Sequence, residues 1–67
     1  MSNVTYPDVT VELSGTDGNA FAIIGKVSKA IRKEVGADEA KKFSSEVLNS
    51  ESYDELIQFC MQTVNVT

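Results

Sequence analysis

The apolar residues of this chain change their spacing abruptly close to its start. Over residues 9–13 the apolar side chains Val9, Val11 and Leu13 alternate with polar ones, the period of two that is typical of a half-buried β-strand. Over residues 19–35 the apolar side chains recur every three or four positions instead, as on one face of an amphipathic α-helix. The sequence therefore predicts a strand, a short turn and a helix in that order.

Two further helices and a closing strand are predicted downstream. Gly36 is expected to end the first helix in a left-handed conformation, and a second helix is expected over residues 37–48. Ser52 then begins a third helix, with Glu55 three positions later completing a capping box. Residues 64–67 alternate again and are expected to pair with residues 9–13. The inner faces expected for the second and third helices are Ala40, Phe43, Val47 and Leu48, and Tyr53, Leu56, Ile57, Cys60, Met61 and Val64.

This order of elements predicts a small α+β domain, β-α-α-α-β, with three helices packed on a short two-stranded sheet. Residues 1–67 form a single domain, in which residues 1–7 are a flexible or edge segment. A sheet of two strands is only marginally stable in water. We therefore expect the chain to form a homo-oligomer, in which the free edge of the first strand can extend the sheet across a dimer.

The composition excludes several classes of function. The chain has 67 residues with one cysteine and no histidine, so it cannot form an internal disulfide, a Cys/His zinc site or a Cys–His catalytic pair. Cys60 lies in the apolar stripe of the third helix and is expected to be core. We therefore predict no enzymatic activity, no metal and no cofactor. The net charge of −4 makes nucleic acid an unfavourable partner.

No membrane partner is expected either. The N-terminal residues lack the basic and apolar regions of a signal peptide, and no run approaches the roughly 20 apolar residues needed to span a bilayer. The sequence is therefore interpreted as that of a cytoplasmic protein.

The turn between strand and helix is a candidate ligand site, formed by Gly15, Thr16, Asp17, Gly18 and Asn19. Glycines that follow a strand and precede a helix allow backbone N–H groups to approach an anion closely. The commoner alternative is a plain turn in which Asp17 or Asn19 caps the helix. The sequence lacks the complete phosphate-loop and dinucleotide-binding motifs, and both interpretations stay open.

Two features are candidate contacts for a protein partner. Lys26, Lys29 and Lys33 lie on the helix face opposite the apolar one, where they can dock an acidic partner or form an ordinary solvated face. Phe59 lies off the predicted apolar stripe of the third helix. Its ring can contact a partner or pack beneath the N-terminal segment.

The run from Val9 to Val27, with its strand, its Gly15–Phe21 junction and its helix, resembles a group of short uncharacterised proteins of bacteria and their phages. Ser52–Leu56 and the surroundings of Cys60 are also similar, so the resemblance covers most of the chain. It implies a small accessory or mobile-element protein that acts by binding.

Two functions from different classes follow from these observations. The first is a small non-catalytic interaction protein, of the kind that a phage uses to modulate or inhibit a host protein; an acidic protein can cover a basic surface of its target. The alternative is a binder or sponge for a small nucleotide-like anion at residues 15–19.

Overall fold

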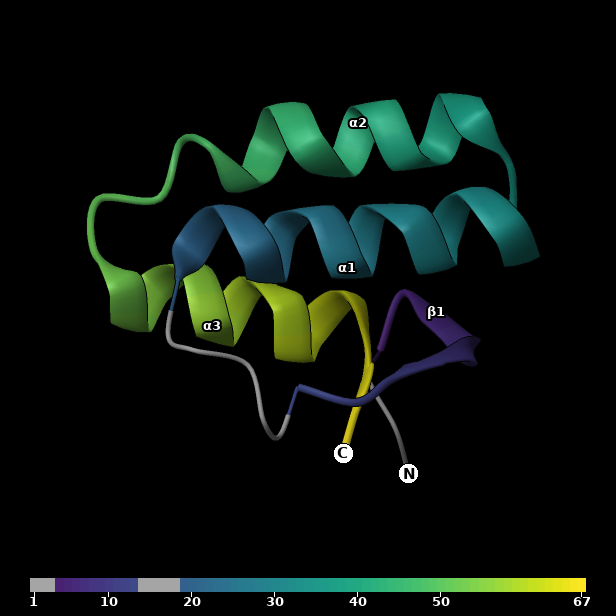
Figure 1. The fold of residues 1–67 in the computed structure, drawn as a ribbon, viewed down its shortest axis with the longest axis horizontal. Coiled ribbons are helices and arrows are strands. Elements are labelled where there is room, and N and C mark those ends of the chain that lie inside the picture. The colour runs from purple at the N-terminus through teal and green to yellow at the C-terminus, as the bar shows by residue number, and fades with distance from the viewer. Residues whose placement is uncertain (1–3, 14–18) are drawn as a thin grey trace.

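The computed structural model describes residues 4–13 and 19–67 of the chain. Within these residues a strand, three helices and a short final strand follow one another, which confirms the predicted β-α-α-α-β order. Their bounds are β1 Tyr6–Val11, α1 Ala20–Glu34, α2 Ala37–Val47, α3 Tyr53–Thr63 and β2 Val64–Val66. Figure 1 labels the first strand and the helices. The first strand begins earlier than predicted, inside the segment that was expected to be flexible or at an edge.

Helix α1 begins at a side-chain cap. The Asn19 Oδ1 accepts hydrogen bonds from the backbone N–H groups of Phe21 (2.9 Å) and Ala22 (3.4 Å), which satisfies two of the donors that a helix N-terminus leaves free. Arg32 and Lys33 lie in the last turn, where positive charge is favoured by the helix dipole.

Gly36 joins α1 to α2 without an intervening loop. Its φ of 152° and ψ of 164° correct the prediction of a left-handed helical conformation, although the positive φ still favours glycine. The extended ψ redirects the chain at once, so that the Gly36 carbonyl already accepts the first hydrogen bond of α2, from Ala40 N (3.1 Å).

Some apolar residues near the ends of α2 and α3 face outward. Leu48 caps the end of α2 and is 61% exposed, and Tyr53 and Met61 of α3 are 45% and 54% exposed. All three were expected on inner faces, and all three predictions are wrong. The Ser52 half of the predicted capping box is confirmed, because the Ser52 Oγ accepts a hydrogen bond from Glu55 N (3.1 Å).

The two strands pair in parallel, Thr10 with Asn65 and Val11 with Val66. This confirms the predicted pairing and establishes its direction. The pairing continues beyond the strands, since Thr67 N donates to Val11 O (3.0 Å) and Leu13 N donates to Thr67 O (3.1 Å). The register is irregular between Tyr6 and Thr10.

The core lies where α1 contacts β1, α2 and α3 (Figure 1). Val27 and Ile31 of α1 are fully buried, and they form one cluster with Val9, Phe43 and Val64 from the surrounding elements. Helix α1 is thus the central element. The side of α1 that faces away from Val27 and Ile31 remains exposed. None of the helices in residues 4–13 and 19–67 is long and apolar enough to cross a membrane.

Candidate functional site

The predicted ligand-binding turn is described only at its last residue. Gly15, Thr16, Asp17 and Gly18 lie outside the described residues, whereas Asn19 is the α1 cap. Its side chain already occupies the N–H groups of Phe21 and Ala22. An anion at this turn would therefore have to use other N–H groups, or displace the Asn19 amide.

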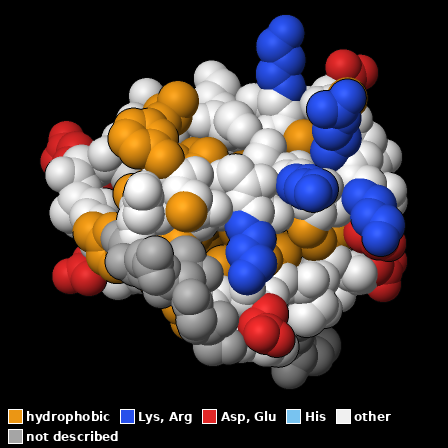
Figure 2. Space-filling view, viewed as in Figure 1, with side chains coloured by type: hydrophobic (Ala, Val, Ile, Leu, Met, Phe, Trp, Pro, Cys, Tyr) orange, Lys and Arg blue, Asp and Glu red, His pale blue; other side chains and the backbone are white. Residues whose placement is uncertain are grey.

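The predicted basic face is exposed on α1. The predicted residues Lys26, Lys29 and Lys33 project from the side that does not contact the core, and the structure adds Arg32 to them. None of these side chains forms an ion pair with a carboxylate of the described residues. Figure 2 shows Lys and Arg side chains gathered over the centre and right of this view, where α1 ends and α2 begins. The cations thus lie together on an exposed surface that is available to another molecule, with acidic side chains at its edges (Figure 2).

A shallow groove of about 290 Å³ runs between α1 and α2 beside these cations. Its lining is Ile24, Gly25, Ser28, Lys29, Arg32 and Ser44. The hydroxyl groups of Ser28 and Ser44 are 2.8 Å apart, and Ser28 Oγ also lies 3.4 Å from Ala40 O. A Cβ atom added at Gly25 would meet nothing within 4 Å. The groove therefore combines two positive charges, two hydroxyls and an open stretch of backbone.

Large apolar side chains are exposed at one end of the helix pair. Phe21 in the first turn of α1 is 76% exposed, and Leu48 at the end of α2 and Tyr53 at the start of α3 are also exposed. Figure 1 places these three helix ends together, and Figure 2 shows hydrophobic side chains gathered at the upper left of the same view. We call the exposed side of α1, together with its groove against α2, the α1–α2 surface. Phe21 and Leu48 form the apolar end of this surface.

Phe59 does not stand free on the surface. It is half-buried and stacks on Phe43 of α2, with ring centroids 5.7 Å apart and an angle of 17° between the planes. The alternative of packing beneath the N-terminal segment describes it better, since Thr5 and Tyr6 line the same hollow. Phe59 can therefore offer a partner only part of its ring.

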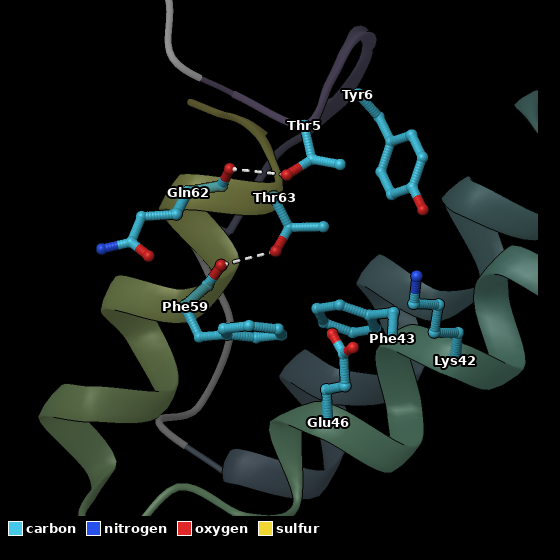
Figure 3. A pocket seen from close by; sticks show the side chains of 8 residues that line it. All are labelled: Thr5, Tyr6, Lys42, Phe43, Glu46, Phe59, Gln62 and Thr63. Atoms are coloured by element: carbon cyan, nitrogen blue, oxygen red, sulfur yellow. Dashed lines mark hydrogen bonds between the residues drawn. The ribbon is translucent and has the colours of Figure 1, made fainter.

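This hollow, of about 260 Å³, opens between β1, α2 and α3 (Figure 3). Its other lining residues include Lys42, Glu46 and Gln62, and α1 lies behind α2 in this view. Thr63 is buried here, and its hydroxyl donates to Phe59 O (2.7 Å). The hollow thus has an aromatic floor and a rim that carries both signs of charge.

Tyr6 connects the hollow to α2. Its hydroxyl donates a hydrogen bond to a Glu39 carboxylate oxygen. That bond, partial burial and the negative charges of Glu39 and Glu46 raise the pKa of the Tyr6 hydroxyl. The phenol is accordingly held in its protonated form and ties the start of β1 to the helices.

Cys60 is fully buried, as expected for a core residue, and burial raises the pKa of its thiol to about 11. A thiol in this state is a poor nucleophile at neutral pH, because the thiolate is the reactive form. Within residues 4–13 and 19–67, no group of three or more Cys, Asp or Glu side chains is arranged to hold a metal ion.

Sequence reasoning found the basic face but missed the groove and the apolar end. The groove depends on Ser28 and Ser44 meeting across two helices, which no spacing along the chain reveals. Comparisons with protein-family models, with curated proteins and with solved structures found no match.

Proposed function

We propose that this chain is a small non-catalytic interaction protein that modulates or inhibits a target protein, in the manner of small phage proteins that bind host proteins. Its binding surface is the exposed side of α1, with the groove that α1 forms with α2. The single observation that carries this proposal is the combination on one surface of unpaired cations with the exposed apolar end at Phe21 and Leu48.

This combination fits what protein interfaces use. Aromatic side chains and arginine are enriched in interfaces and supply much of their binding energy. Phe21 is a large aromatic side chain with most of its area in water, and Arg32, eleven residues later, returns to nearly the same side of the helix. A partner that covers both would gain apolar burial and charge pairing together.

The chain's reactive groups give less support to other functions. Its one thiol is buried and has a raised pKa, which argues against covalent chemistry. Binding of a nucleotide-like anion at residues 15–19 is the second candidate, but Asn19 competes for the N–H groups of the first helical turn. We therefore favour the protein-binding function.

Site-specific photo-crosslinking in cells tests the location of the binding surface. A photoreactive phenylalanine analogue at position 21 is expected to capture a defined protein. The same analogue at Gln58, an exposed residue of α3 that lines a different hollow, is the matched control. The captured protein should be lost when Lys29→Glu and Arg32→Glu are combined with the analogue at position 21. Equal capture from both positions, or capture that survives the charge reversal, would contradict the proposal.

A further inference from the structure

The geometry of the α1–α2 surface points to one kind of partner. We infer that the groove binds an acidic amphipathic helix of a target protein, with a carboxylate seated at Lys29, Arg32 and the Ser28–Ser44 hydroxyl pair. An apolar side chain of the same helix would pack on the apolar end. This inference rests on the proposed function and adds to it the chemistry of the partner.

The seat for the carboxylate is built from complementary groups. Lys29 and Arg32 line the groove and bring two positive charges to it, and a guanidinium can bind a carboxylate through two parallel N–H···O bonds. Ser28 and Ser44 are half-buried beneath them, with their hydroxyls in mutual contact. A hydroxyl that is a donor to its neighbour can turn its proton toward an anion instead.

The groove also permits a close approach of another backbone. Gly25 lines it, and the space where a Cβ would stand is open. Small residues at helix surfaces let two backbones come near each other, which increases packing contacts. Gly25 lowers the intrinsic stability of α1, and the open approach offers a reason for glycine at this position.

The spacing of the apolar end and the cations matches a helix laid along α1. Lys29 lies eight residues after Phe21, which is about 12 Å along a helix. Arg32 lies about 16 Å along and only about 20° around the helix from Phe21. A partner helix with an apolar residue near one end and acids about two turns further on would meet both features at once.

Charge favours an acidic protein segment over nucleic acid. All six Lys and Arg residues lie in α1 and α2, but the chain contains ten Asp and Glu residues and has a net charge of −4. The phosphates of a long nucleic acid would also approach those carboxylates, and the electrostatic repulsion would grow with its length. A short acidic helix can remain within the basic surface.

Titration of the isotope-labelled protein with synthetic peptides tests this inference. The probe is an alanine-rich helical peptide with a leucine near one end and three glutamates about eight positions further on. We expect saturable NMR shifts at the amides of Gly25, Ser28 and Ser44, and an affinity that falls as salt is added. A peptide with glutamine in place of glutamate should bind at least about tenfold more weakly.

Matched variants of the protein locate the seat. Lys29→Glu should weaken binding of the glutamate peptide by about tenfold or more, whereas Lys42→Glu, the same charge change at the other hollow, should change it little. Gly25→Leu should block the groove by bulk, and it should retain the fold because the position is exposed and its Cβ would meet no atom within 4 Å.

Several outcomes would overturn the inference. They are equal binding of the glutamine peptide, preferential binding of a short RNA or of anionic vesicles, and a dimer of the protein that Lys29→Glu converts to monomer. Failure of the peptide experiment while the position-21 crosslink still captures a protein would remove the acidic-helix partner and leave the proposed function standing. If the analogue at position 21 captured no protein even without the charge reversals, the proposed function itself would be removed.

Discussion

Two glycines occupy opposite backbone environments in this chain. Gly25 lies in the middle of α1 with ordinary helical geometry and open space around it, whereas Gly36 has a φ of 152°. Gly25→Ala should therefore stabilise the protein by about 0.5–1 kcal/mol, because alanine loses less backbone entropy in a helix. Gly36→Ala should destabilise it by about 1–3 kcal/mol, because a side chain strains that conformation.

Urea denaturation of both alanine variants measures these effects. The two substitutions add the same methyl group, so each variant is the control for the other. Equal effects of the same sign would show that the backbone angle at Gly36 does not govern the connection between α1 and α2.

The buried thiol makes stability depend on alkaline pH. The pKa of Cys60 is raised from 9.0 to about 11 in the folded chain. Below pH 9 the thiol is protonated in both the folded and the unfolded chain, so it does not make the free energy of unfolding depend on pH. Between the two values the unfolded chain loses the proton while the folded chain keeps it. The free energy of unfolding should then fall by up to about 1.4 kcal/mol per pH unit.

Chemical denaturation of the wild type and of Cys60→Ala at a series of pH values checks this expectation. The variant should be less stable at pH 7 because of the cavity, yet its stability should decline less steeply between pH 9 and 11. Tyr6→Phe is a useful second variant, since the raised pKa of Tyr6 acts in the same direction. Identical slopes for wild type and Cys60→Ala would contradict the role of the thiol.

At the scale of the elements, the contact between Phe43 and Phe59 joins α2 to α3. Their stacked rings should contribute about 0.5–1.5 kcal/mol beyond the area that each buries. A double-mutant cycle with Phe43→Leu and Phe59→Leu isolates this energy, because leucine keeps most of the apolar volume. Strict additivity of the two substitutions would show that the rings stabilise the protein independently.

The third helix shows where periodicity misleads. At about 100° per residue, Met61 stands about 140° from Leu56, whereas Thr63 stands only about 20° from it. Thr63 is buried because its hydroxyl is satisfied by Phe59 O. When a threonine is counted as polar, the apparent apolar stripe turns toward Met61 and away from Phe59. The sequence therefore located the helix but misplaced the centre of its buried face.

Helix ends and strand pairing were more predictable than faces. Asn19 and Ser52 cap their helices through local contacts of two or three residues, which a sequence displays directly. The alternation in residues 64–67 likewise indicated a strand. Its parallel direction depends on how three helices return the chain across the molecule, and the α1–α2 groove depends on a contact between residues 28 and 44. Such long-range geometry leaves no pattern within one segment.

At the scale of the whole molecule, the positive charges are confined to two of the helices. Every Lys and Arg lies in α1 or α2, whereas Glu51 lies just before α3 and Asp54 and Glu55 lie in its first turn. The homo-oligomer stays a prediction. One way to form it is a contact between the cations of α1 and α2 in one copy and the acids near the start of α3 in another. A self-contact of this kind would weaken with added salt, whereas sheet extension along β1 would be much less sensitive to it. Sedimentation at two salt concentrations separates the two modes.

The parallel sheet also implies an order of folding. Helices α1 and α2 follow each other directly and pack together, whereas β1 and β2 pair across more than fifty residues. Closing so long a loop costs entropy before the strand contacts repay it. We therefore expect the helices to be formed in the transition state and the sheet to form later.

Stopped-flow kinetics of two buried-valine variants tests this order. Val27→Ala in α1 should mainly slow folding, and Val64→Ala at the start of β2 should mainly speed unfolding. Both side chains are fully buried and lose the same atoms, so a difference between them reports on their place in the folding sequence. Faster unfolding in Val27→Ala together with slower folding in Val64→Ala would mean that the chain ends pair first. The distant termini would then nucleate the fold in spite of the loop that separates them.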